Sequence, residues 1–133
     1  MTTNRFLAEG IGTFALVFAG CGAIIVNDAF GGALGHVGVS LVFGLIVMAM
    51  IYSVGNISGA HLNPAVTLAF FSAGRLEKHD ILPYIGSQIA GAVLAALMLR
   101  LLYPGHATLG ATLPVSGVIR AFAMEVILSF LLM

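Results

Sequence analysis

Three long apolar segments with almost no charge constrain this chain more than any other feature. They cover about residues 6–26, 37–54 and 81–103 of the 133-residue sequence, and each is close to the roughly 20 residues that an α-helix needs to cross a bilayer. Hydrophobic residues make up 60% of the sequence and charged residues 8%, against roughly 45–50% and about 25% in soluble domains. The sequence therefore predicts an all-α membrane protein whose surroundings are the lipid bilayer.

A fourth apolar segment covers residues 118–133. As a helix it would be about 24 Å long, which is shorter than the roughly 30 Å of bilayer hydrocarbon. It ends without a glycine stop or a basic last turn. We expect it to be the opening of a further spanning helix that is cut off within the membrane.

The charge balance and the side-chain content exclude several kinds of function. Five Lys and Arg residues match five Asp and Glu residues, so the chain has no basic face for nucleic acid. Cys21 is the single cysteine, which excludes an internal disulfide and argues against a metal site. The sequence shows no catalytic set of Ser, His and Asp, no paired carboxylates and no phosphate-binding glycine loop. We therefore expect neither an enzyme nor a bound cofactor.

The first apolar segment has a second interpretation. Arg5, the apolar run after it and the small residues at 18–21 are similar to a secretory signal with a cleavage site. Glu9 lies inside the run, where such a signal normally carries no acid, and two more spanning segments follow. These features favour a spanning helix.

Basic residues indicate how the chain is oriented in the membrane. With the N-terminus in the cytoplasm, Arg5, Arg75 and Lys78 lie inside, and Arg100 and Arg120 lie outside. Cytoplasmic segments of membrane proteins carry the excess of Lys and Arg. The count of three to two therefore favours a cytoplasmic N-terminus.

The segment after the second apolar run is too polar at its start to span a membrane and too apolar at its end for an ordinary loop. Asn63 and Pro64 form a helix start, because Asn is a preferred N-cap residue and Pro is favoured at the first helical position. Gly74 supplies the stop. The pattern predicts irregular backbone over 58–62 and a half-length helix over 64–73. Irregular backbone at membrane depth has to be buried in protein or line a wet cavity, so the helix is expected to be re-entrant.

Three motifs at this point resemble one family. Residues 58–67 (SGAHLNPAVT) resemble the first signature loop of the aquaporin and glycerol-facilitator family, the major intrinsic proteins. Residues 8–14 (AEGIGTF) resemble the family's first-helix motif, and residues 88–92 (QIAGA) resemble its third-helix motif. The resemblance implies a fold of six spanning helices in two inverted repeats. This chain would supply the first half of that bundle.

An internal repeat supports the same interpretation. Residues 6–16 and 122–132 share Phe, Glu, Ile, Phe and Leu at matching positions. Inverted repeats are common in membrane transporters and place the site between the two halves. We expect residues 1–117 to form the first aquaporin-like repeat and residues 118–133 to form the truncated opening helix of the second.

The resemblance implies a pore in which the backbone carbonyls of residues 59–62 form a ladder for water and the Asn63 amide donates at its top. The N-terminus of the half-helix carries about half a positive charge, which would repel cations at that point. The alternative is an ordinary Asn-Pro helix start at the protein surface. The expected pore-lining residues are Phe43, Val47, Gly59, Ala60, His61, Leu62, Asn63, Pro64 and Ala65.

Two of these side chains carry expectations about selectivity. Phe43 lies where water-selective members of the family resemble one another in carrying an aromatic residue, and Val47 shares its helix face one turn later. A Phe would narrow the passage and favour water over glycerol, whereas the alternative is packing against lipid or a neighbouring helix. His61 is expected to act through its backbone carbonyl, with a pH gate as the alternative.

Two acids lie within apolar segments, Glu9 and Glu125. Acids inside a membrane usually face the interior of the protein and have a partner. The resemblance implies that both are buried and accept hydrogen bonds from re-entrant loops. A proton relay is the alternative, but the chain of ionisable groups that it needs is missing. The glycines expected to allow close helix contacts are Gly12, Gly20, Gly44, Gly55, Gly59 and Gly91.

The function implied by the resemblance is a passive transmembrane channel for water, located in the plasma membrane and homotetrameric when complete. Two alternatives stay open. One is a channel for glycerol or another small neutral solute, and the other is a non-conducting, half-length membrane protein.

Overall fold

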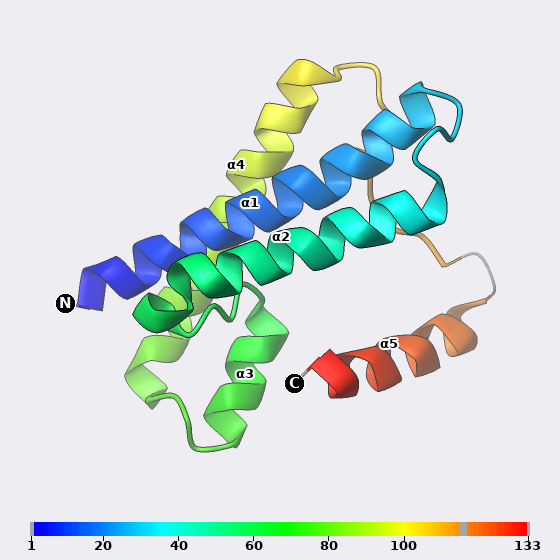
Figure 1. The fold of residues 1–133 in the computed structure, drawn as a ribbon. Helices are drawn as coiled ribbons and strands as arrows, with labels where there is room; N and C mark the ends of the chain where they lie inside the picture. Colours follow the sequence, from blue (N-terminus) through cyan, green and yellow to red (C-terminus); the bar gives the residue numbers. More distant parts are fainter. Residues whose placement is uncertain (1, 115–116, 133) are drawn as a thin grey trace.

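The computed structural model describes residues 2–114 and 117–132, and these residues are helical apart from the connections. Three of the helices, α1, α2 and α4, are long and apolar enough to cross a membrane. This result confirms the prediction of an all-α membrane fold with three spanning helices. The elements in chain order (Figure 1) are α1 (Thr2–Ala29), α2 (Gly35–Ser58), α3 (Pro64–Ser72), the short 3₁₀ helix η1 (Lys78–Asp80), α4 (Ile81–Leu102) and α5 (Val118–Leu132).

The second helix is longer than the sequence suggested. We predicted a break from residue 55 onwards, but α2 continues to Ser58. The Gly59 amide donates to the Gly55 carbonyl at 2.9 Å, so the helical hydrogen bonds persist through Gly55. Gly59 then adopts a left-handed conformation with φ of 89° and ends the helix.

Helix α1 is the centre of the packed part of the chain. It packs against both α2 and α4, and the short helix α3 packs against α4. Figure 1 shows α1 and α2 running side by side, with α4 crossing behind α1. Helix α5 shares no comparable packing with the other elements among the described residues. The loop between α2 and α3 is thereby held next to α1 and α4.

Glycines allow the close contacts of α1. A Cβ atom on Gly91 of α4 would collide with the backbone of Gly10. A Cβ on Gly12 would collide with the Leu62 side chain, which comes from the loop after α2. The expectation of close helix contacts is confirmed at Gly91, and at Gly20, where a Cβ would collide with the Phe43 ring of α2. At Gly12 the close neighbour belongs to the loop and not to another helix.

The same expectation is wrong for two glycines of α2. A Cβ on Gly44 would meet no atom within 4 Å among the described residues. A Cβ on Gly55 would meet only Ile51 of its own helix, at 3.8 Å. Neither position therefore meets another helix of the described chain through its Cβ direction.

The distribution of polarity is inverted relative to a soluble protein. Many large apolar side chains on the spanning helices are exposed, for example Leu82 at 79% and Leu101 at 78%. The buried polar and charged side chains are Glu9, Thr13, Ser58, His61, Thr67, Asp80 and Gln88. Apolar exteriors suit a lipid environment, and the buried polar side chains mark the place where chemistry is concentrated.

The α1–α4 contact can be tested by adding one methyl group. Gly91→Ala places a Cβ against the Gly10 backbone, so the helices have to separate and stability is expected to fall by roughly 1–3 kcal/mol. Gly86→Ala is the matched control, because a Cβ there meets nothing within 4 Å. Thermal unfolding in detergent should show a lower midpoint for Gly91→Ala alone. Equal midpoints for the two variants would contradict this packing.

Candidate functional site

The loop between α2 and α3 has an unusual backbone. Gly59, Ala60 and Leu62 all have positive φ, at 89°, 49° and 54°. For Ala and Leu this left-handed conformation is uncommon and unfavourable. The surrounding structure therefore has to hold the loop in place.

Glu9 of α1 is the main contact that holds the loop. Its Oε1 accepts hydrogen bonds from Ser58 Oγ at 2.6 Å and from the His61 amide at 2.9 Å. Its Oε2 accepts from the Leu62 amide at 2.7 Å and from Gln88 Nε2 at 2.8 Å. The side chain is 0% exposed. Every partner is a donor, which is the arrangement that satisfies an acceptor-only carboxylate.

Helix α4 supplies a second set of contacts on the same loop. Gln88 Nε2 donates to Thr67 Oγ1 at 2.9 Å as well as to Glu9. The Tyr84 hydroxyl donates to the Ser58 carbonyl at 2.7 Å, and Tyr84 is 0% exposed. Tyr84 and Gln88 lie one helical turn apart, so one face of α4 contacts both the end of α2 and the start of α3.

Sequence reasoning gave no role to Tyr84, Thr67 or Gln88. Gln88 stood inside a recognised motif, and Thr67 stood at the end of another. The signal that could have found Tyr84 is its spacing, because a polar group four residues before Gln88 shares its face on an apolar helix. The partner of its hydroxyl, the Ser58 carbonyl, could not be read from the sequence.

The hydrogen bonds divide the loop into a bound side and a free side. The amides of Gly59, Ala60, His61 and Leu62 all donate within the protein, to Gly55 O, Ser58 Oγ and the Glu9 carboxylate. No residue in the described part of the chain donates to the carbonyls of residues 59–62. Residues 59–62 therefore offer a run of hydrogen-bond acceptors and no free backbone donor.

Asn63 adds a donor at the end of this run. Its Oδ1 accepts from the Ala65 amide at 2.8 Å, which makes Asn63 the N-cap of α3, with Pro64 at the first helical position. Because Oδ1 is used by the cap, the Nδ2 group is the part of the amide left for another partner. Asn63 is exposed, so this NH₂ group is accessible. The predicted helix start at Asn63 and Pro64 is confirmed.

A hollow of about 230 Å³ lies beside the loop. Its lining combines residues of the loop with apolar side chains from α1, α2 and α3. His61 is held at its edge by stacking on Phe70, with ring centroids 4.5 Å apart. The lining residues are Leu16, Val47, Ile51, Gly59, Ala60, His61, Leu62, Asn63, Val66 and Phe70.

The structure brings most, but not all, of the expected pore residues to this hollow. Val47 lines it together with the loop. Phe43 does not, because its ring lies over Gly20 of α1, where a Cβ would collide with it. Pro64 and Ala65 begin α3 behind the loop and are not part of the lining.

Glu125 differs from the expectation that it is a buried acid. It is exposed on α5, and none of the hydrogen bonds of the described residues involves its carboxylate. The physical reason is that α5 has no comparable packing against the other helices, so no loop reaches this side chain.

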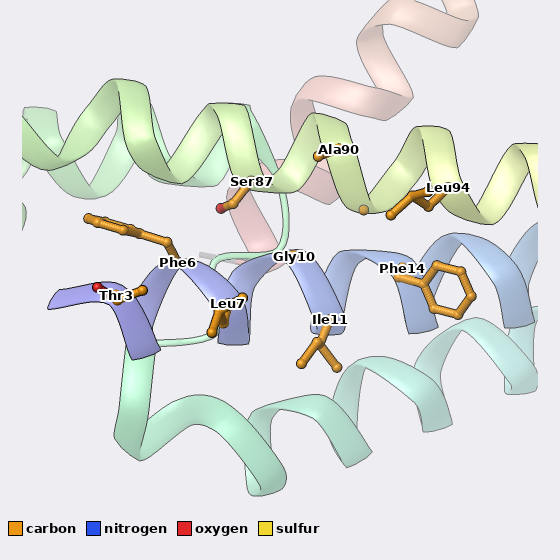
Figure 2. Close-up of a pocket in the computed structure, with 10 residues that line it drawn as sticks. Thr3, Phe6, Leu7, Gly10, Ile11, Phe14, Ser87, Ala90 and Leu94 are labelled. Atoms are coloured by element: carbon orange, nitrogen blue, oxygen red, sulfur yellow. The ribbon is translucent and has the colours of Figure 1, made fainter. Parts of the chain in front are cut away.

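A second hollow lies between α1 and α4 and has a different character. Figure 2 shows Phe6, Ile11 and Phe14 of α1 and Leu94 of α4 around it. It measures about 410 Å³ and has no titratable side chain in its lining. Ser87, its polar member from α4, already donates to the Tyr84 carbonyl at 2.9 Å. The chemistry of the molecule is therefore concentrated at the loop.

Metal chemistry has no ligand cluster to use in the described part of the chain. Residues 2–114 and 117–132 contain no group of three or more neighbouring His, Cys, Asp or Glu side chains that could hold a metal ion. The loop offers neutral backbone carbonyls and one side-chain amide instead. These groups suit a neutral polar molecule.

Comparison with known proteins agrees with the motifs. The model of the family described as "Major intrinsic protein" matches residues 1–133. The chain is 48% identical over 133 residues to "Putative aquaporin NIP4-1" of Arabidopsis thaliana, covering 98% of this chain and 47% of the relative. It is 52% identical over 108 residues to "Aquaporin Z" of Rhodopseudomonas palustris, covering 80% of this chain and 45% of the relative. The chain thus spans about half the length of these curated relatives.

Glu9→Gln should destabilise the chain strongly. The substituted side chain turns one acceptor oxygen into an NH₂ group, which then faces donors such as the Leu62 amide or Gln88 Nε2. Leaving buried donors without an acceptor is expected to cost roughly 2–5 kcal/mol. The measurement is abundance in the membrane fraction together with the unfolding midpoint in detergent. Glu77→Gln, at an exposed acid, is the control, and equal losses in both variants would refute the role of Glu9.

Tyr84→Phe should have a smaller effect on the same loop. The variant keeps the ring but removes the donor to the buried Ser58 carbonyl, at an expected cost of about 1–3 kcal/mol. Tyr52→Phe is the control, because Tyr52 is 83% exposed. Hydrogen exchange of the loop amides should accelerate in Tyr84→Phe and not in Tyr52→Phe. An unchanged exchange rate in Tyr84→Phe would show that this hydrogen bond does not hold the loop.

Proposed function

Because the chain belongs to the major intrinsic protein family, we propose that it supplies the first half of a passive transmembrane channel for water. The family match and the aquaporin relatives support a membrane channel. The three long apolar helices support an integral membrane protein. The loop of residues 58–63 is the proposed conducting element.

The division of donors and acceptors in the loop carries this proposal. A water molecule both donates and accepts hydrogen bonds, so it can replace its lost water neighbours by donating to the carbonyls of residues 59–62. The Asn63 NH₂ group can donate to its oxygen at the end of the run. The apolar lining side chains Leu16, Val47 and Ile51 offer no competing hydrogen bonds. A water molecule would then stay aligned along one polar side of the passage.

The length of α3 supports a position for Asn63 near the middle of the membrane. Helix α3 has 9 residues, which corresponds to about 13 Å, or somewhat less than half of the hydrocarbon thickness. Its N-terminus at Asn63 carries a partial positive charge of about half a unit. At the centre of a bilayer this charge would oppose the passage of cations, including hydronium, while neutral water passes.

Glycerol or another small neutral solute is the second candidate. The observation that favours it is the presence of both apolar side chains and loop residues in the lining, because a polyol has a carbon side as well as a hydroxyl side. Water remains the main proposal because the branched Val47 side chain lines the hollow. Narrowing by this side chain would disfavour the larger molecule.

The orientation and assembly are proposals on the same basis. Arg5 of α1 pairs with Asp80 at 2.9 Å, so the N-terminus lies at the same end of the molecule as η1. Arg75 and Lys78 lie next to this end in the chain, and the excess of basic residues there favours the cytoplasm. We propose a plasma-membrane location and a homotetramer for the complete channel, as the family resemblance implies.

A chimera tests the proposed function directly. Residues 1–133 would replace the matched half of "Aquaporin Z" of Rhodopseudomonas palustris, and the purified chimera would be reconstituted in liposomes. Under osmotic shock, stopped-flow light scattering should record rapid shrinkage with a low activation energy and no proton leak. Asn63→Asp in the same chimera keeps the N-cap oxygen but removes the NH₂ donor and adds a negative charge. It should slow shrinkage by about tenfold, which corresponds to about 1.4 kcal/mol.

Two outcomes of this experiment would favour the alternatives, and the chain alone provides a separate comparison. Rapid passage of glycerol with slow passage of water would favour the second candidate. A folded, abundant chimera that passes neither would favour a non-conducting protein. Liposomes that contain the 133-residue chain alone should not shrink rapidly, because the loop carbonyls then have no second half-helix opposite them.

A further inference from the structure

A histidine at the opposite end of the helices links three elements. His106 lies in the connection after α4, and its Nε2 is 3.3 Å from Asp28 Oδ2 at the end of α1. The Leu109 amide donates to His106 Nδ1 at 3.1 Å. Arg100 of α4 donates to the His106 carbonyl at 2.9 Å. His106 and Leu109 lie outside the spanning segments, whereas Asp28 and Arg100 lie near the ends of theirs.

The hydrogen bonds define the protonation state of this imidazole. A backbone N–H can only donate, so Nδ1 has to present its lone pair to Leu109. A neutral imidazole with a bare Nδ1 carries its proton on Nε2, and that proton is donated to the Asp28 carboxylate. A protonated histidine has two donor nitrogens and cannot make both contacts.

The turn that Nδ1 holds is under conformational constraint. Leu109 has a φ of 50° and Gly110 a φ of 72°, and the left-handed conformation is unfavourable for Leu. A Cβ on Gly110 would collide with the backbone of Cys21, so this turn is pressed against α1. The hydrogen bond from the Leu109 amide to His106 therefore helps to hold the 109–110 turn, with its unfavourable backbone conformation, against α1.

We propose that His106 is a pH-sensitive latch that holds the 109–110 turn on α1 when neutral and releases it when protonated. Histidine is the side chain whose charge normally changes between about pH 5 and 8. Protonation would place an Nδ1–H group against the Leu109 N–H group, so two donors would face each other. The charged groups around the ring are Asp28 from α1 and Arg100 from α4. Asp28 attracts the protonated ring, and Arg100 keeps its hydrogen bond to the His106 carbonyl, so His106 stays in place. The 109–110 turn is the part that moves away from α1.

This proposal is independent of what the channel conducts. It concerns the connection from α4 to α5 and the end of α1, whereas the proposed conducting loop is held by Glu9 near the start of α1. Its consequence is that acidification changes the shape of one end of the molecule. The test needs only the full 133-residue chain.

Nuclear magnetic resonance of the ¹⁵N-labelled chain in detergent micelles tests the latch. Near pH 8, the long-range histidine spectrum should show a proton on His106 Nε2 and a bare Nδ1. On acidification to about pH 5, the Leu109 amide resonance should move with the same midpoint as the His106 ring. Its protection from hydrogen exchange, corrected for the pH dependence of exchange itself, should fall by about tenfold.

Two variants make the result specific to His106. His106→Gln does not titrate, so the Leu109 transition should disappear, whereas His36→Gln, at an exposed histidine at the same end of the molecule, should leave it unchanged. Persistence of the transition in His106→Gln would overturn the proposal. So would a protonated Nδ1 near pH 8, or a His106 titration that leaves the Leu109 amide unmoved. The Nδ1 protonation state near pH 8 and the response of the Leu109 amide are both measured on the unmodified chain. They test the proposal even when His106→Gln does not fold.

Discussion

The ionised carboxylate of Glu9 is the interaction on which the rest of the site depends. A charge without partners inside a membrane protein is costly, and here each carboxylate oxygen accepts two hydrogen bonds. Two of the donors are consecutive backbone amides, of His61 and Leu62. Binding both amides fixes the direction of the chain between them and sustains the positive φ of Leu62. The loop supplies donors to the buried carboxylate, and the carboxylate in turn holds the loop amides in place.

Close helix packing makes this arrangement possible. Gly10 and Gly91 let the backbones of α1 and α4 approach, so that Gln88 of α4 reaches the Glu9 carboxylate at 2.8 Å. Contacts of this kind matter more in lipid than in water, because apolar helix faces gain little from meeting one another in a bilayer. Small residues bring the helices together, and the buried polar side chains then specify one arrangement. The exposed Leu and Ile side chains take no part in these contacts between helices.

The features that could be predicted from the sequence were those set by local rules. The length of the apolar segments predicted α1, α2 and α4, and the Asn63-Pro64 pair predicted where α3 begins. The contacts that decide the site are tertiary and could not be derived in that way. The bond from the Tyr84 hydroxyl to the Ser58 carbonyl joins residues 26 positions apart. Glu125 shows the same limit, because its sequence environment matches that of Glu9 and its burial depends on neighbours that α5 does not have here.

The chemistry of the loop follows from the same bonds that fold it. When Glu9 and Ser58 accept from the amides of residues 60–62, these three residues have no backbone donors left to offer a molecule in the hollow. When the N-cap bond takes up Asn63 Oδ1, the same residue presents only its NH₂ group. A run of acceptors that ends in one donor is thus what remains after the structural hydrogen bonds are made. Changes to Glu9 or Ser58 therefore alter stability and the hydrogen-bonding character of the hollow together, whereas changes to Val47 or Ile51 alter the width of the hollow and leave those bonds intact.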